Sequence, residues 1–208
     1  MTGLIDGYRR FRATDWRKHR TRFEELAEGG QSPRALVIAC SDSRVDPQMI
    51  FHAAPGELFV VRNVANLVPP YAPNSDYHGT SAALEFAVRS LGVQEVVVMG
   101  HNRCGGIAAL LRGPTPETGD FVGPWMQIAA SARDRALAQA PALAEADRSE
   151  ALHRLCEHEG VRVSLANLMT FPWLRARVEA GNLTLHGYHF DIRSGDLVPV
   201  DAAEGIAA

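Results

Sequence analysis

The hydrophobic positions of the chain alternate between short β-branched runs and longer helical patterns. Four runs rich in Val, Ile and Leu predict strands, the first three apolar enough to be covered on both faces: Ala35 to Ala39, Leu58 to Val61, Glu95 to Met99 and Leu183 to Ile192. Helical spacing predicts helices over Thr80 to Leu91, Ile107 to Arg112, Gly123 to Gln139 and Ser149 to Met169. The first of these helices is apolar nearly all round, which indicates a buried helix.

This order of strands and helices predicts an α/β domain with a mainly parallel central sheet. Parallel neighbours need a crossover, and helices on both faces of the sheet supply it. We expect the strands that begin at Ala35 and Glu95 to lie side by side, and an additional C-terminal strand to form an edge. In open parallel sheets, ligands bind beyond the carboxyl ends of the strands, near the point where strand order reverses.

The first 30 residues follow a pattern of their own. Apolar residues recur at helical spacing among charges, as at Leu4, Tyr8 and Phe11, before Gly29 and Gly30 end the pattern. A narrow apolar face of this kind needs another surface to pack on. We therefore expect a single domain in two parts, an N-terminal helical arm (residues 1–30) and an α/β domain (residues 31–208).

Composition excludes several classes of function. Hydrophobic residues make up 46% of the chain and charged residues 22%, as in ordinary globular domains. A formal net charge of −3 offers no positive field to a phosphate backbone, so we expect no nucleic-acid partner. The longest uncharged stretch, 63–75, has 13 residues, too few to cross a membrane. Charges stand where a signal peptide needs its apolar segment, which predicts a cytoplasmic protein.

Two of the three cysteines and one histidine lie at the carboxyl ends of the two strands expected to be neighbours. Cys40 ends one run, and His101 and Cys104 follow the other. Each has an ordinary explanation taken singly, but together they form a Cys₂His set, which is known for catalytic zinc with a fourth position left for water. We expect one Zn²⁺ per chain on these ligands. A helix N-terminus after Cys104 should lower the pKa of its thiol, whereas Cys156 lies on an apolar helical face and should pack in the core.

Asp42 and Arg44 directly follow the first of these cysteines. An Arg this close keeps the Asp ionised and can fix its orientation through two hydrogen bonds. The simpler alternative is a helix N-cap with a surface ion pair. Because two thiolates neutralise the charge of Zn²⁺, the metal acidifies its water less, and a carboxylate that orients the resulting hydroxide becomes useful. We expect Asp42 to have this role, held by Arg44.

These motifs together resemble the β-class carbonic anhydrases. Cys-x-Asp-Ser-Arg begins at Cys40, Gly-His-x-x-Cys-Gly-Gly begins at Gly100, and the similarity extends from about Gln31 to Val200. The resemblance implies reversible hydration of carbon dioxide to bicarbonate and a proton, by attack of hydroxide on zinc. It also implies a homo-oligomer, a dimer or a dimer of dimers, whose N-terminal helices wrap the partner chain.

The resemblance also assigns the carbon dioxide pocket. In the plant-like branch of the family, a glutamine before the first strand and an aromatic residue in the second line this pocket, and here they are Gln31 and Phe59. A tyrosine that is usual in the following helix is Phe86 here, so one pocket hydroxyl is missing. We expect these three side chains to contact the substrate.

Another branch of the family is regulated by bicarbonate at a second site made by a Trp, a Tyr and an Arg. The corresponding residues here are Val37, Phe190 and Arg62, so only the arginine is kept. We therefore expect the chain to be closer to the plant-like branch and to lack this regulation.

Three other functions would use parts of the same pattern. A hydrolase of carbonyl sulfide or carbon disulfide would use the same zinc site and differ only in pocket shape. A thiol phosphatase or sulfurtransferase would use Cys40 as its nucleophile, but Arg44 follows too closely and the loop has no glycine to cradle a phosphate. A non-enzymatic zinc-containing bicarbonate sensor would not need the pair of Asp42 and Arg44.

Overall fold

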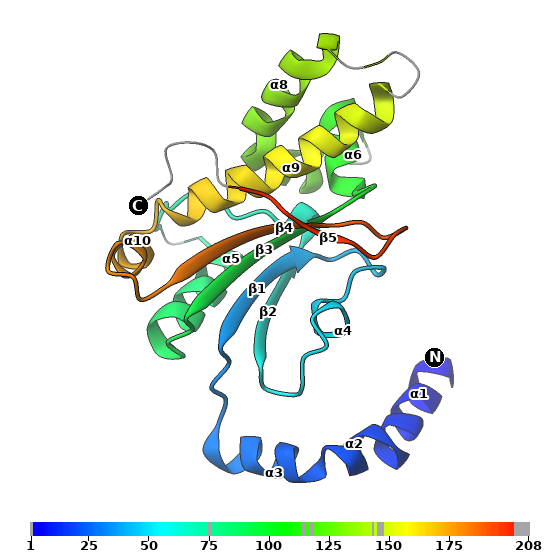
Figure 1. Ribbon diagram of the computed structural model, residues 1–208, viewed down its shortest axis with the longest axis vertical. Helices are drawn as coiled ribbons and strands as arrows, with labels where there is room; N and C mark the ends of the chain where they lie inside the picture. The colour runs from blue at the N-terminus through cyan, green and yellow to red at the C-terminus, as the bar shows by residue number, and fades with distance from the viewer. Residues whose placement is uncertain are drawn as a thin grey trace.

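The computed structural model describes residues 2–74, 76–113, 115–116, 119–142, 144 and 148–201. A five-stranded sheet of order β2-β1-β3-β4-β5 runs through its centre (Figure 1). The strands are β1 (Ala35–Cys40), β2 (Leu58–Asn63), β3 (Glu95–His101), β4 (Thr184–Phe190) and β5 (Leu197–Pro199). The first four pair in parallel, and β5 pairs antiparallel with β4. The predicted fold class is therefore confirmed, with β1 and β3 as direct neighbours.

The helices follow the predicted segments closely, with three additions. The arm comprises α1 (Thr2–Ala13), α2 (Asp15–Lys18) and α3 (Arg20–Gly29), and the domain holds α4 (Pro47–Ile50), α5 (Gly79–Glu85), α6 (Gly105–Arg112), α7 (Val122–Met126), α8 (Ala130–Gln139), α9 (Arg148–Leu168) and α10 (Pro172–Glu179). Single turns η1 (Val64–Asn66), η2 (Phe86–Ser90), η4 (Gln127–Ala129) and η5 (Ala140–Ala142) extend or join them. Short α4, η1 and α10 were not predicted, and α10 begins with a proline, which suits the first helical position.

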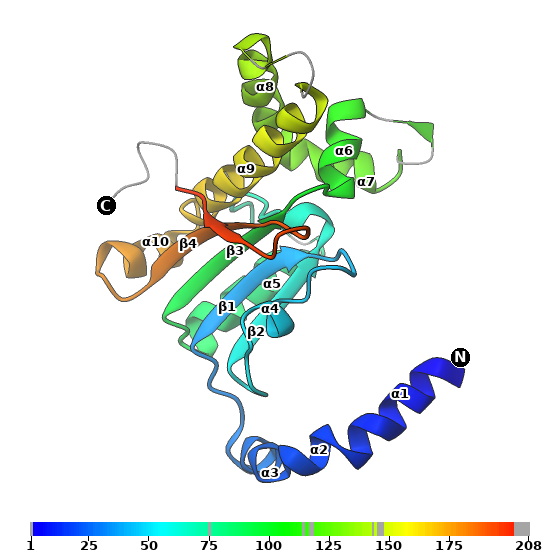
Figure 2. The ribbon, with the colours of Figure 1, turned by 45° about the vertical axis from the view of Figure 1, so that its right-hand side comes forward.

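The two faces of the sheet are covered unequally. Alternate residues of β1 and β3, such as Leu36 and Val96, pack with side chains of α5, α9 and α10 in one large cluster. The opposite face, with Val37 and Met99, packs on the segment around α4 and on the edge near β5. Figure 2 shows the long α9 next to β4 and the short α4 near β1 and β2. Residues of each strand alternate between the two faces because successive side chains of a strand point in opposite directions.

Two expectations about burial were wrong. The strand β2 is only half-buried, because it forms the edge of the sheet and has a neighbour on one side alone. The segment predicted as a buried helix divides into α5 and the wider turn η2, and only Leu84, Ala87 and Val88 are buried there. Phe86 is 47% exposed. This segment therefore carries more apolar side chains than the described part of the chain buries.

The arm extends away from the sheet, and its helix α3 contacts the loop before β2 (Figures 1 and 2). Arg22 Nε donates to Pro55 O at 3.2 Å, and a Cβ placed on Gly56 would lie 2.6 Å from Leu26 Cδ2. Leu4 is 82% and Tyr8 58% exposed, so most of the apolar face of α1 is uncovered by the described residues, although Phe11 packs edge-on against Phe23 of α3.

The helix α3 ends at Gly29, and residues 202–208 of the expected domain lie outside the described residues. Among the helices that are described, none has the length and apolar character needed to span a bilayer.

Candidate metal centre

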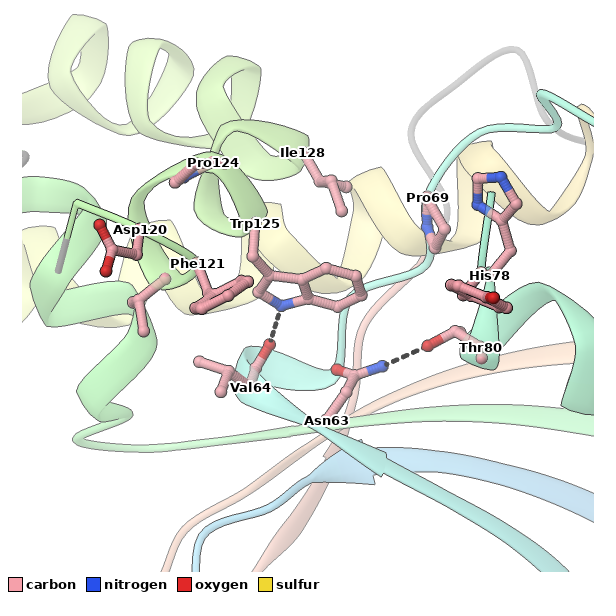
Figure 3. A pocket seen from close by; sticks show the side chains of 13 residues that line it. Asn63, Val64, Pro69, His78, Thr80, Asp120, Phe121, Pro124, Trp125 and Ile128 are labelled. Atoms are coloured by element: carbon pink, nitrogen blue, oxygen red, sulfur yellow. Dashed lines mark hydrogen bonds between the residues drawn. The ribbon is translucent and has the colours of Figure 1, made fainter. Parts of the chain in front are cut away.

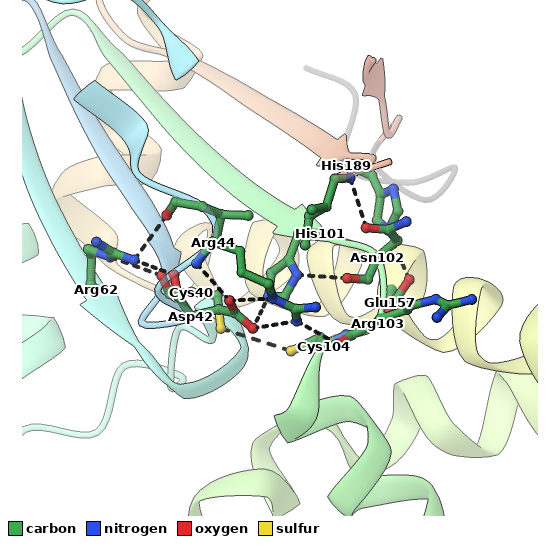
Figure 4. A network of polar contacts seen from close by, with 12 residues as sticks. Cys40, Asp42, Arg44, Arg62, His101, Asn102, Arg103, Cys104, Glu157 and His189 are labelled. Atoms are coloured by element: carbon green, nitrogen blue, oxygen red, sulfur yellow. Dashed lines mark hydrogen bonds and ion pairs between the residues drawn. The ribbon is translucent and has the colours of Figure 1, made fainter. Parts of the chain in front are cut away.

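The three predicted metal ligands meet at the carboxyl edge of the sheet. Cys40 ends β1, His101 ends β3, and Cys104 stands at the N-cap of α6 (Figure 4). Because β1 and β3 pair in parallel, both strand ends reach the same edge. One ligand atom from each residue lies within 4.8 Å of the other two, and the two Sγ atoms are 3.9 Å apart. This is also the point where the strand order reverses.

The donor set fits a metal ion. His101 Nδ1 lies 2.9 Å from Asn102 O, which makes Nδ1 the protonated nitrogen and leaves Nε2 with a lone pair. That Nε2 is buried and has no hydrogen-bond partner among the described residues. An orphaned imidazole nitrogen beside two cysteine sulfurs suits a metal that prefers nitrogen and sulfur ligands.

The two thiols have pKa values that are shifted in opposite directions. The hydrogen bond from Cys104 lowers the pKa of the Cys40 thiol to about 4, although burial acts in the opposite direction. The pKa of Cys104 is raised, first by its hydrogen bond to Cys40 and then by burial. The expected lowering at a helix N-terminus is present, since backbone N–H groups of α6 act that way, but these two effects outweigh it.

Asp42 and Arg44 form a doubly bonded pair next to the cluster. Arg44 Nε and Nη2 donate to the two carboxylate oxygens at 2.9 and 2.7 Å, and the backbone N–H of Arg44 donates to Asp42 Oδ1 at 2.9 Å. Arg44 holds the pKa of Asp42 well below its usual range. Asp42 Oδ2 lies 3.9 Å from His101 Nε2. The N-cap of α4 is Asp46 rather than Asp42, which excludes the N-cap part of the simpler alternative, whereas its ion pair is present.

Arg62 holds the loop that carries this pair. Its guanidinium donates to three backbone carbonyls, Cys40 O at 3.0 Å, Asp42 O at 2.6 Å and Val45 O at 3.0 Å. A further N–H reaches Asp46 Oδ2 at 3.3 Å. The sequence did not reveal this role, because backbone carbonyls leave no trace in residue patterns. With these donors occupied, Arg62 supports the expected lack of a second bicarbonate site, which remains a prediction.

The structure also shows a buried carboxyl group that the sequence-based reasoning missed. Glu157 Oε1 accepts a hydrogen bond from the backbone N–H of Cys104 at 3.0 Å. The signal was available, since Glu157 stands one helical turn before Val161 and two before Leu165, on the core stripe of α9. A glutamate on the buried face of a helix is costly unless its carboxylate is hydrogen-bonded or paired, so this position indicates a polar partner.

The three expected pocket residues do not join the metal cluster within one chain. Phe59 pairs with Leu36 in the sheet, four residues before Cys40 and thus about 13 Å along the strand. Phe86 packs on Phe59 with ring centroids 5.9 Å apart. Gln31 is exposed and precedes β1, at the opposite end of the strand from Cys40.

A large apolar pocket lies beside the cluster, but Cys40, His101 and Cys104 are not among the residues that line it. It has a volume of about 700 Å³ and is walled by the loop before α5, by η1 and by α7, with Trp125 Nε1 donating to Val64 O at 2.8 Å (Figure 3). Asn63, which pairs with Cys40 in the sheet, lines its nearer side.

This fold and site have clear relatives. The family described as "Carbonic anhydrase" matches residues 35–197, and the chain belongs to this family, in its β class.

Among individual proteins, a carbonic anhydrase of Pseudomonas aeruginosa is 41% identical over 98% of this chain and 89% of its own length. Beta carbonic anhydrase 3 of Arabidopsis thaliana is 38% identical over 92% of this chain and 73% of its own length. Among solved structures, the β-carbonic anhydrase CcaA has a TM-score of 0.86 at 35% identity, covering 97% of this chain and 95% of that one. A tetrameric β-carbonic anhydrase of Sordaria macrospora has a TM-score of 0.84 at 28% identity, covering 97% and 96%. The protein is therefore an enzyme of the carbonic anhydrase family.

Proposed function

We propose that this chain catalyses the reversible hydration of carbon dioxide at one zinc ion held by Cys40, His101 and Cys104. The observation that carries the proposal is the convergence of these ligand atoms within 4.8 Å, with an unpartnered imidazole nitrogen among them. Zinc bound by three protein ligands supplies a Lewis acid that generates a hydroxide nucleophile near neutral pH. The family reaction of the relatives agrees with this chemistry.

Asp42 orients the attacking oxygen in this proposal. Its low pKa keeps the carboxylate ionised, so it can only accept a hydrogen bond, and an attacking O–H must point its hydrogen toward Asp42. The lone pair of that oxygen then faces the carbon of the substrate. Arg44 holds both carboxylate oxygens and so prevents Asp42 from turning toward the metal ligands.

Carbon dioxide would bind between two chains of a homo-oligomer. Gln31, Phe59 and Phe86 lie too far along the sheet to reach the cluster of their own chain, but two of them are exposed and available to a second copy. The apolar rings would hold the substrate, and the Gln31 amide would donate to one of its oxygens. The unpacked arm and the tetrameric relative from Sordaria macrospora support such an assembly.

Metal analysis combined with stopped-flow hydration tests the proposal on the purified protein and on Cys104→Ser. We expect about one zinc per chain in the wild type, and loss of both zinc and hydration in the variant, because two ligands hold the ion far more weakly than three. Cys156→Ser is the matched control, since Cys156 is a buried cysteine of α9 outside the cluster. Wild-type protein that contains zinc yet hydrates no carbon dioxide would contradict the proposal.

A further inference from the structure

The turn from His101 to Cys104, which carries two of the proposed ligands, has a strained backbone that contacts from other elements stabilise. Between His101 and Cys104, Arg103 has a φ of 55°, in the left-handed region that non-glycine residues rarely adopt. Such a conformation costs free energy and persists only when neighbouring groups fix it. On the exposed side, Arg44 Nη2 donates to Arg103 O at 3.1 Å. The buried side of the turn needs a contact of its own.

Glu157 supplies this contact from α9. Its side chain is only 2% exposed, and Oε1 accepts the backbone N–H of Cys104 at 3.0 Å. One helical turn earlier, His153 Nε2 lies 3.1 Å from Cys104 O. Both polar groups of the Cys104 backbone are therefore met by side chains of the same helix.

The second oxygen of Glu157 reaches the sheet. His189 Nε2, from the inner strand β4, lies 2.9 Å from Glu157 Oε2 (Figure 4). The ring of His158 packs on His189 with centroids 4.5 Å apart. Glu157 thus connects α9, β4 and the ligand-bearing turn through one carboxyl group.

We propose that Glu157 is a positioning residue for the metal centre, which fixes the ligand Cys104 by accepting its backbone N–H and anchors it to His189. The inference rests on the proposed metal site. Removal of a residue that hydrogen-bonds to a metal ligand typically lowers metal affinity or activity about 10- to 100-fold. Glu157 acts on the backbone of a ligand, so its effect should appear in metal binding itself.

Cobalt binding tests this without measuring catalysis. Co²⁺ added to metal-free protein gives a thiolate-to-cobalt absorption band, and its affinity follows from competition with a chelator. For Glu157→Leu we expect a roughly 10- to 100-fold loss of Co²⁺ affinity and a changed band, because the Cys104 N–H loses its acceptor. For Glu157→Gln, whose amide oxygen can still accept that N–H, we expect affinity and band to stay close to wild type.

Glu159→Gln is the matched control. Glu159 is also a buried glutamate of α9, but Arg135 and Arg162 bind its carboxylate, and the Cys104 turn does not touch it. We expect wild-type affinity in this variant. Unchanged affinity in Glu157→Leu would overturn the proposal, and so would equal losses in Glu157→Leu and Glu157→Gln or in all three variants. Wild-type protein that binds Co²⁺ on its thiolates but lacks hydration activity would refute the proposed function while leaving this inference standing.

Discussion

In the proposed mechanism, the position of the Asp42 carboxylate directs the attacking oxygen. Arg44 meets both of its oxygens, and the resulting low pKa makes Asp42 a permanent acceptor over the range in which proteins are folded. Because the pKa of Asp42 is depressed, its carboxylate keeps its charge until the pH falls far into the acid range. A neutral side chain of the same shape would present a donor at the same place.

Replacing Asp42 by Asn tests this directly. We expect zinc content to remain and the hydration rate to fall by about 10²- to 10⁴-fold, the usual contribution of a positioned acid or base group. Asp46→Asn is the control, because Asp46 caps α4 and contacts Arg62 without facing the cluster. Hydration by Asp42→Asn at the wild-type rate in stopped-flow measurements would remove Asp42 from the mechanism.

The sequence predicted the ligands because strand ends can be located from hydrophobic runs, and a parallel sheet brings those ends to one edge. Cys40 and His101 follow from that rule alone. The contacts of Arg62 and Glu157 do not, because both bind backbone atoms whose positions depend on loop conformation. The pattern of residues specifies chemistry at the site better than it specifies what holds the site.

Among the elements, α6 approaches η1 so closely that one glycine has no room for a side chain. A Cβ on Gly106 would lie 2.8 Å from Val64 Cγ1, 2.9 Å from Ala65 Cβ and 3.3 Å from Met126 Sδ. The preceding Gly105 is exposed and has nothing within 4 Å of that position. Two adjacent glycines of the same motif therefore have different roles, and only one of them is required for packing.

We expect Gly106→Ala and Gly105→Ala to change stability in opposite directions. Gly106→Ala should lower the free energy of unfolding by about 1–3 kcal/mol, as overpacking does in a closely packed core. Gly105→Ala should raise it by about 0.4–1 kcal/mol, because alanine favours the helix and restricts the unfolded chain. Urea unfolding of both proteins measures the difference, and a stabilised Gly106→Ala would show that α6 and η1 can separate freely.

Hydrophobic periodicity located the helices and strands of the domain but not how much of each is covered. It overstated the burial of β2, which is an edge strand, and of the segment containing Phe86, which is half exposed. An additional C-terminal edge strand was expected and is β5, but periodicity gave no residue range for it, because three residues are too few for a period of two to stand out. In a sequence, apolar residues that a second chain would cover cannot be distinguished from apolar residues of the core.

For the whole molecule, the arm and the pocket residues point to the same assembly. The apolar face of α1 is exposed, and Phe59 and Phe86 lie far along the sheet from the cluster of their own chain. If a second copy covers both, each site combines ligands from one chain with a pocket from the other. That arrangement makes two inactive variants complementary.

Co-expression of Cys104→Ser with the double variant Gln31→Ala, Phe59→Ala tests this arrangement. Each variant alone should be inactive or nearly so, but a mixed dimer has one site with intact ligands from the double variant and an intact pocket from the other chain. We expect stopped-flow hydration to recover to as much as half the wild-type rate per purified mixed dimer. No recovery in a mixed dimer that binds zinc would show that each chain supplies its own pocket.

The two cysteines that meet at the cluster are 64 residues apart along the chain, and they approach to 3.9 Å only because a parallel crossover separates and then reunites their strands. An unfolded chain holds no such pair, so capture of the ion favours the native state alone and adds its binding free energy to that of folding. Zinc binding at this site would therefore stabilise the folded protein against unfolding. A shortage of the metal would leave newly synthesised protein both inactive and more readily degraded.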